Sequence, residues 1–378
     1  MRMTGRARAA VLLAASSLVL VGCSSGNSSS GSPDTTSATN TTASTTSSSD
    51  SGASTVPSES ASSMELPQSV IDAAKKEGKV VYYSSEVKNI NDAAAAEFEK
   101  KYGIKVEVLK AANPELQSRY SSEKQANQVV ADVLRLTDDA IFAQNPDWFV
   151  KLDSSYLPAL QGFTATDFAD QDRSVSSQFN AYSINYNTDL VKSGDAPKTW
   201  DDLLKPAFTG KIALADTRTD ITWVGWADAM QTAKGADWLK KFGEQKPTII
   251  DTATDAAQQV AAGSYALAVP QFPAHITPLK AKGAPVATVV PTDPALLKPD
   301  HIAVSQDAPH PNAARLFANF RLSREFLSTA CGLNVLVSPV DGVSGCEEMP
   351  ANPVIAKGAF TDQEEATMAS EMGLPPAK

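Results

Sequence analysis

Few residues in this 378-residue chain could form a metal centre, a disulfide framework or a nucleic-acid interface. The sequence holds only three histidines and three cysteines, too few for a multi-histidine metal site or a disulfide-dense scaffold. Lys and Arg number 33 against 43 Asp and Glu, which gives a net charge of −10. Binding to nucleic-acid phosphates needs the opposite balance. We therefore expect no nucleic-acid partner.

The first 63 residues contain little that could build a hydrophobic core. Residues 1–22 join three arginines to an apolar run, 9–21, which is the pattern of a secretory signal. The run is shorter than the about 20 apolar residues of a membrane-spanning helix. Ser and Thr dominate residues 24–63, and such a segment cannot bury enough apolar surface to offset its ordering entropy. We predict a signal peptide at 1–22 and a disordered tether at 23–63.

The end of the apolar run predicts how the protein is attached. Leu20-Val21-Gly22-Cys23 resembles the lipobox of bacterial lipoproteins. The resemblance implies cleavage before Cys23 and lipidation of its thiol, so the protein would be extracytoplasmic and lipid-anchored to the cell membrane. The alternative is a plain secretory signal in which Cys23 lies near the cut by chance.

The rest of the chain alternates strand and helix patterns. Apolar runs at 79–84, 105–109 and 131–136 predict strands, and helical patterns lie between them. This β-α-β-α-β order predicts an α/β fold with a parallel sheet and right-handed crossovers. A second α/β region follows the alternating strand at 179–187, and a folded part of this length normally divides into two lobes.

The predicted strand ends of the first region carry the first candidate ligand-binding residues. In parallel sheets, ligands bind beyond the carboxyl ends of the strands. Helix N-termini follow these ends, and their free N–H groups suit anions and polar oxygens. Simple helix capping is the alternative, but the coincidence at three successive strand ends favours a ligand site. The candidates are Ser84, Ser85, Asn113, Thr137 and Asp138.

The second region adds a possible anion clamp. Arg218 lies on a predicted strand-to-helix turn, where a guanidinium could hold a carboxylate or phosphate. It could instead be a surface residue paired with Asp216 or Asp220. Trp223 is a weaker candidate, because its spacing to the next tryptophan is typical of core packing. The other candidate ligand-binding residues in this region are Ser183, Thr217, Thr219, Tyr265 and Gln271.

Seven short stretches, in this order, carry a family resemblance. They are EGKVVYYS at 77–84, FEKKYGIKV at 98–106, ADVL at 131–134, AYSINYNT at 181–188, PKTWDDLL at 197–204, GKI at 210–212 and APHPNAARLF at 308–317. No single stretch is decisive. Their order and spacing within residues 66–345 resemble the type II solute-binding proteins of ABC importers, closest to the ferric iron, thiamine and phosphorylated-solute branch.

The resemblance implies the periplasmic-binding-protein type II fold, in which two α/β lobes are joined by two hinge strands and close on a solute in the cleft. Lobe one would begin with 64–178, and lobe two would hold 179–290. Residues 291–378 would return to lobe one and end in C-terminal helices that could pack on either lobe. The implied partners are a small polar or anionic solute and ABC permease subunits. We expect a monomer without a cofactor.

Ferric members of this family hold iron through two adjacent tyrosines in a later loop. The matching place here, residues 270–275, has no tyrosine pair. Tyr82 and Tyr83 are adjacent, but alternation along a strand sends their rings to opposite faces. We therefore expect no metal ligand set. An Fe(III) site built without a tyrosine pair remains an alternative.

Two further expectations concern cysteines and catalysis. Cys331 and Cys346 remain once Cys23 is lipidated, and in an exported protein they favour a disulfide. The folded part contains no hydrolase, nucleotide-binding or metalloprotease motif. We expect no enzyme activity, and a secreted α/β hydrolase-like enzyme with a site built from distant residues is the alternative.

Overall fold

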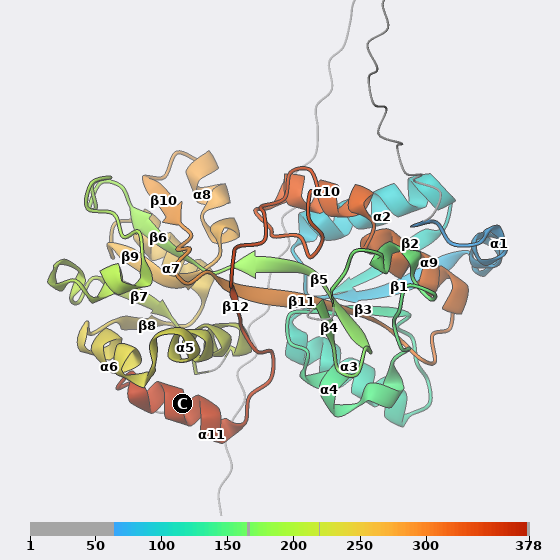
Figure 1. Cartoon of the computed structure of the whole chain (residues 1–378), viewed down its shortest axis with the longest axis horizontal. Helices are drawn as coiled ribbons and strands as arrows, with labels where there is room; N and C mark the ends of the chain where they lie inside the picture. The colour runs from blue at the N-terminus through green and yellow to red at the C-terminus, as the bar shows by residue number, and fades with distance from the viewer. Residues whose placement is uncertain (1–63, 165–166, 219, 376–378) are drawn as a thin grey trace, which may run out of the picture. The chain divides into compact units, whose positions relative to one another are not determined.

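Two β-sheets organise the part of the chain that the computed structural model describes, residues 64–164, 167–218 and 220–375 (Figure 1). Each sheet is packed against helices, so the α/β fold and the two lobes predicted from the sequence are confirmed. The predictions for the signal peptide, the tether, Cys23 and Thr219 lie outside the described residues.

Lobe one is built on a seven-stranded mixed sheet. Its strands, in spatial order, are β2 (Lys105–Lys110), β1 (Lys79–Ser84), β3 (Val133–Leu136), β11 (Leu296–Val304), β5 (Ser174–Ala181) and β4 (Phe168–Ala169), with β12 (Val354–Ile355) paired to β11. The first three strands are parallel, and β11 runs antiparallel to both β3 and β5. The parallel β1–β3 core is the one predicted from the alternating pattern.

Helices cover both faces of this sheet. They are α1 (Gln68–Glu77), α2 (Lys88–Tyr102), α3 (Asn113–Gln125), α4 (Ala140–Gln144), α9 (Pro311–Arg321) and α10 (Arg324–Leu333), with 3₁₀ turns η2 (Pro146–Trp148) and η3 (Pro158–Leu160). Tyr82 packs in the cluster that contains Phe98 and Phe317, whereas Tyr83 packs in the cluster of Tyr120 and Phe149. The two adjacent tyrosines therefore lie on opposite faces of the sheet, as strand alternation requires.

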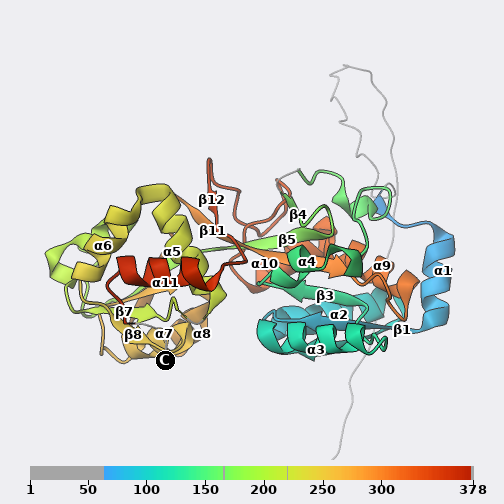
Figure 2. The ribbon, with the colours of Figure 1, turned by 90° about the horizontal axis from the view of Figure 1, so that it is seen from below.

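Lobe two is built on a five-stranded sheet. Its strands, in order, are β10 (Val286–Val289), β6 (Ser183–Asn187), β9 (Leu267–Gln271), β7 (Ile212–Ala215) and β8 (Thr248–Ile250). Its helices are α5 (Ile221–Lys234), α6 (Ala236–Glu244), α7 (Ala253–Ala261), α8 (Thr277–Ala281) and α11 (Asp362–Glu371), with 3₁₀ turns η5 (Trp200–Leu204), η6 (Pro206–Phe208) and η7 (Pro273–His275). The C-terminal α11 packs on α5 and α6 (Figure 2).

The chain passes between the two sheets three times. The β5–β6 and β10–β11 connections are the two hinge crossings that the family resemblance implies. A third passage follows β12, which pairs with β11 of lobe one before the chain reaches α11 on lobe two. The C-terminal helices are thus divided: α9 and α10 pack in lobe one, and α11 packs in lobe two.

Several local details differ from the patterns read in the sequence. The strand predicted at 179–187 is interrupted at Tyr182, whose N–H donates to the carbonyl of Leu296 at 3.0 Å. A capping box formed by Thr199 and Asp202 starts the 3₁₀ turn η5. Asn113 makes no capping hydrogen bond to its own helix α3.

The disulfide prediction is confirmed, because Cys331 at the end of α10 is bonded to Cys346 in the following loop. Among the described residues, no helix combines the length and apolar character needed to cross a membrane.

Candidate functional site

A cavity of about 390 Å³ lies between the lobes, a size within the range of small-molecule sites. Strand ends and loops of both lobes line it. The lining residues are Ser85, Glu86, Val87, Arg135, Thr137, Gln178, Asn180, Thr222, Trp223, Thr254, Phe272, Ala274, His275, Pro278, Asp300 and Asn334. Lobe one supplies mainly polar and charged side chains to this wall, whereas lobe two supplies the aromatic ones.

Two hydroxyl groups from the ends of β1 and β3 form part of the polar wall. The Ser85 hydroxyl accepts a hydrogen bond from the backbone N–H of Thr137 at 3.3 Å, and the two hydroxyl oxygens are 3.5 Å apart. Asn113 supports this pair from outside the cavity, because its Oδ1 accepts from the same Thr137 N–H at 3.1 Å. The strand ends therefore converge on the cleft in the way that a parallel sheet predicts.

A buried ion-pair network lies beneath the polar wall. Arg135 of β3 pairs with Asp300 of β11, and its Nη2 lies 3.3 Å from Glu86 Oε1. Arg321 of α9 pairs with the other oxygen of Glu86 at 2.6 Å. All four side chains are at most 3% exposed. Such a network is stable only when the charges stay paired, since an isolated buried charge is very costly.

The network leaves three buried polar atoms of cavity-lining residues without hydrogen-bond partners. Gln178 and Asn180 of β5 donate to Asp300 Oδ2 at 3.0 and 2.6 Å. In contrast, Asp300 Oδ1, Arg135 Nε and Glu86 Oε1 are buried and have no hydrogen-bond partner among the described residues. A buried unpaired donor or acceptor costs about 1–3 kcal/mol.

Three rings form the opposite wall. The Trp223 ring of α5 lies with its centroid 5.2 Å from Phe272 and 5.7 Å from His275. Burial lowers the pKa of His275 to about 4, so the imidazole is neutral at physiological pH. This wall therefore offers flat surfaces and no net charge.

Most of the other sequence candidates lie behind the cavity walls. The Ser84 hydroxyl accepts from the backbone N–H of Glu86 at 3.1 Å and shapes the turn after β1. Asp138 accepts from Ala140 N–H at the start of α4. Gln271 is fully buried beneath the aromatic wall, where its Nε2 donates to the Ala253 carbonyl at 3.2 Å.

The remaining candidates are also outside the lining. Ser183 and Thr217 are at most 1% exposed, and no hydrogen bond to either hydroxyl is found in the described structure. Tyr265 lines a separate hollow of lobe two with Leu190 and Phe208. Of the residues singled out in the sequence, the structure brings Ser85, Thr137 and Trp223 to the cavity.

Arg218 is the main correction to the sequence-based site. Its Nε and Nη2 donate to the two carboxylate oxygens of Asp216, each at 2.8 Å, and its Nη1 donates to the Pro375 carbonyl at 2.8 Å. It lies beside α11 and does not line the cavity. The guanidinium is therefore engaged by its neighbour Asp216, the pairing that the sequence left open as the alternative.

Sequence reasoning missed the residues that contribute most charge to the site. A signal was present in the β3 run Val133–Leu136, where Arg135 interrupts three aliphatic residues. An arginine in a buried strand needs a buried carboxylate partner. The partner, Asp300, lies 165 residues further along the chain, and the local pattern does not identify it. Glu86, Gln178, Asn180, Phe272 and His275 were missed for the same reason.

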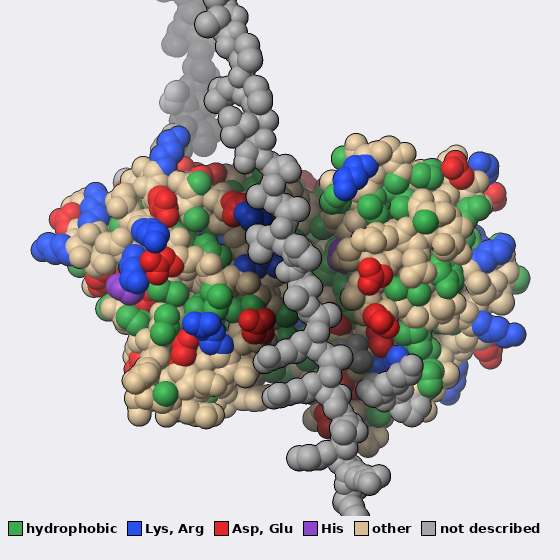
Figure 3. Space-filling view, turned by 180° about the vertical axis from the view of Figure 1, so that it is seen from behind, with side chains coloured by type: hydrophobic (Ala, Val, Ile, Leu, Met, Phe, Trp, Pro, Cys, Tyr) green, Lys and Arg blue, Asp and Glu red, His purple; other side chains and the backbone are tan. Residues whose placement is uncertain are grey.

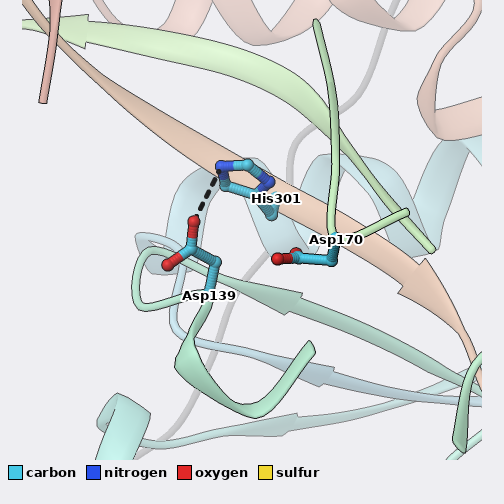
Figure 4. Close-up of side chains that lie close together, drawn as sticks. All are labelled: Asp139, Asp170 and His301. Carbon is cyan, nitrogen blue, oxygen red and sulfur yellow. Dashed lines mark ion pairs between the residues drawn. The ribbon is translucent and has the colours of Figure 1, made fainter. Parts of the chain in front are cut away.

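Candidate metal ligands are of two kinds: the adjacent tyrosines that the sequence raised, and a group of side chains that it did not predict. The residues lining the described cavity include no tyrosine. The Tyr83 hydroxyl instead donates to Glu123 at 2.5 Å, and burial raises its pKa to about 12. Away from the cavity, Asp139, Asp170 and His301 bring their ligand atoms within 4.8 Å of one another (Figure 4).

The surface carries charges of both signs. On the face shown in Figure 3, Lys and Arg side chains are interspersed with Asp and Glu over both lobes. This face has no continuous basic stripe of the kind that tracks a phosphate backbone.

Comparisons with known proteins agree with this architecture. The model of bacterial extracellular solute-binding proteins matches residues 93–353. A search among curated proteins finds no match. Trichodesmium IdiA (FutA), solved with iron and citrate, is 20% identical with a TM-score of 0.65, covering 79% of this chain and 100% of its own.

Two further solved structures are similar. Iron-bound HitA of Pseudomonas aeruginosa is 19% identical with a TM-score of 0.59, covering 78% of this chain and 98% of its own. AfuA of Actinobacillus pleuropneumoniae, solved with fructose-6-phosphate, is 20% identical with a TM-score of 0.59, covering 79% and 99%. At these identities the likeness shows the fold alone.

Proposed function

We propose, from the premise that this chain belongs to the family of bacterial extracellular solute-binding proteins, that it is the receptor of an ABC importer. It captures a small polar or anionic solute in the interlobe cavity and delivers it to the permease subunits. It acts as a monomer and performs no covalent chemistry.

The observation that carries this proposal is the interlobe cavity, whose polar wall includes the ion pair of Arg135 and Asp300. The guanidinium donor suits a carboxylate or phosphoryl oxygen. The Asp300 carboxylate suits a hydroxyl or ammonium group of the same solute. The Ser85 and Thr137 hydroxyls beside them add further hydrogen-bonding capacity. A solute with oxygen atoms on one side and a flat or apolar surface for Trp223 fits both walls.

Solute contacts of this kind would also favour lobe closure. The cavity wall draws on β1, β3, β5 and β11 of lobe one and on α5 and the loop after β9 of lobe two. A solute that bonds to both walls stabilises the closed arrangement more than the open one, which is the condition for a ligand-driven shift. The closed lobes would then present the permease with a surface that the open receptor lacks.

The proposed location rests on the sequence of the first 63 residues. Lipidated Cys23 would anchor the protein outside the cytoplasm on the cell membrane, with the Ser/Thr-rich segment as a tether. Mass spectrometry of the membrane-associated protein is expected to find a diacylated N-terminal Cys23. Membrane-associated protein with an unmodified Cys23 would contradict the anchor.

No observation on the described residues favours the hydrolase-like alternative. His275 is the histidine that lines the cavity, and its Nδ1 lies 3.1 Å from Phe272 N and 3.0 Å from Gln271 Oε1. A hydrolytic site would instead pair the imidazole with a nucleophile, normally a hydroxyl or thiol.

The solute is identified by native mass spectrometry of the purified protein, followed by calorimetric titration with phosphorylated, carboxylate and polyamine compounds. We expect Thr137→Val to weaken binding of the identified solute about tenfold, the loss of roughly one hydrogen bond. Arg218→Ala is the matched control, because Arg218 lies outside the cavity. This variant should bind the solute with the affinity of the wild type. Absence of binding across the panel, or equal losses in both variants, would overturn the proposed site.

A further inference from the structure

Outside the cavity, three side chains of lobe one converge on one point. Asp139 lies at the start of α4, Asp170 in the turn between β4 and β5, and His301 on β11. Figure 4 shows the imidazole of His301 facing the Asp139 carboxylate, with the Asp170 carboxylate directed toward the space between them. One ligand atom from each lies within 4.8 Å of the other two. Three elements distant in sequence thus bring nitrogen and oxygen ligands together.

The hydrogen bonds around Ser174 determine which imidazole nitrogen carries a proton. The Ser174 hydroxyl donates its only hydrogen to Asp170 Oδ2 at 2.7 Å. Its oxygen lies 3.2 Å from His301 Nδ1, so at this contact it accepts and Nδ1 donates. The neutral ring then has no hydrogen on Nε2. A histidine whose second nitrogen is held in this way is typical of metal ligands.

The unprotonated Nε2 of His301 faces a second hydrogen-bond acceptor, the Asp139 carboxylate. It lies 3.6 Å from Asp139 Oδ2, and neither His301 Nε2 nor Asp139 Oδ1 has a hydrogen-bond partner among the described residues. His301 is only 3% exposed, so bulk water does not compensate. A lone pair and a carboxylate facing each other in a buried site need a positive species between them.

A proton on His301 would be one such species, and a metal ion is another. Charged side chains of both signs surround His301. Asp139 and Asp300 lie near it, and so do the buried cations Lys298 and Arg135.

We propose that lobe one contains a binding site for a divalent transition-metal ion, with His301 Nε2 and the carboxylates of Asp139 and Asp170 as protein ligands. The combination of one imidazole and two carboxylates suits Zn²⁺, with a solvent molecule completing a tetrahedral set. Access is available from the carboxylate side, because the Asp139 side chain is 17% exposed. The ion would connect β11, the strand of the second hinge crossing, to α4 and the β4–β5 turn.

This site is separate from the solute cavity, since none of its three ligands lines that cavity. Its metal would therefore be a fixed component of lobe one and not the transported solute. The proposal is independent of the solute's identity, and its failure would leave the importer function untouched.

The test titrates the chelator-treated full-length protein with Co²⁺, followed by its visible absorption bands, and with Zn²⁺ by calorimetry. We expect one equivalent of either ion to bind. Asp170→Asn and Asp139→Asn each remove one anionic ligand and should weaken binding at least tenfold. Far-UV circular dichroism verifies that each variant is folded.

His310→Asn is the matched control. His310 Nδ1 pairs with Asp132 Oδ2 at 2.8 Å in the same lobe, but no third ligand joins this pair in the described structure. Binding equal to that of the wild type is expected. The proposal is overturned if the wild type binds less than about one tenth of an equivalent, or if folded Asp170→Asn and Asp139→Asn bind Co²⁺ as tightly as the control.

Discussion

Arg135 has two roles, one in the packing of lobe one and one in the wall of the solute cavity. It holds Asp300 and Glu86 in a buried network, and it presents a donor to the solute cavity. A guanidinium serves both purposes because it has five N–H groups in a fixed plane. A lysine at this position would supply the charge but not the simultaneous contacts. The chemistry of the cleft and the packing of lobe one are therefore coupled through this side chain.

Removal of this guanidinium should cost far more than removal of a surface cation. Arg135→Ala leaves Asp300 and Glu86 with fewer compensating charges, so we expect the free energy of unfolding to fall by about 3–5 kcal/mol. Lys88→Ala breaks an exposed pair with Asp92 and should cost less than about 1 kcal/mol. Urea denaturation compares the two variants. Similar losses would show that the Arg135 network does not contribute as proposed.

The contacts of individual side chains were harder to predict than the helices and strands. Ser85 and Thr137 were found because strand-end position is a local property of the sequence. The pairing of Arg135 with Asp300 depends instead on the antiparallel register between β3 and β11, which no local pattern specifies. Arg218 is a different case, because its partner Asp216 is only two residues away and the sequence left that pairing open as an alternative.

Secondary-structure elements were more predictable, because their signals are local. The strand predicted at 79–84 agrees with the structure. The helices before and after it end at Gly78 and Gly103, and both glycines have left-handed backbone angles. The packing of α11 on lobe two was left open, since an amphipathic helix can cover any apolar face. The structure places it on α5 and α6.

Gly243 of α6 permits this packing. A Cβ atom at this position would lie 2.1 Å from the backbone carbonyl oxygen of Met372 at the end of α11, closer than any real contact. We expect Gly243→Ala to displace α11 and to increase amide hydrogen exchange in α5, α6 and α11. Gly194→Ala is the control, because nothing lies within 4 Å of the added atom. Unchanged exchange in Gly243→Ala would contradict this role of α11.

At the scale of the whole molecule, the polar and aromatic walls belong to different lobes. Ser85, Thr137 and Asn180 move with lobe one, whereas Trp223 moves with lobe two. Any change in the separation of the lobes therefore alters the surroundings of Trp223. The other lobe-two tryptophans, such as Trp238 stacked on Phe242, are packed in the core.

This difference provides a direct test of solute-driven closure. Addition of the identified solute should change the intrinsic fluorescence of the wild type, because the Trp223 ring loses contact with water and gains polar neighbours from lobe one. Trp223→Phe should remove most of that change, while Trp238→Phe should retain it. A full fluorescence response in Trp223→Phe would mean that the solute binds without bringing the polar wall to this ring, and lobe closure around the cavity would then be wrong.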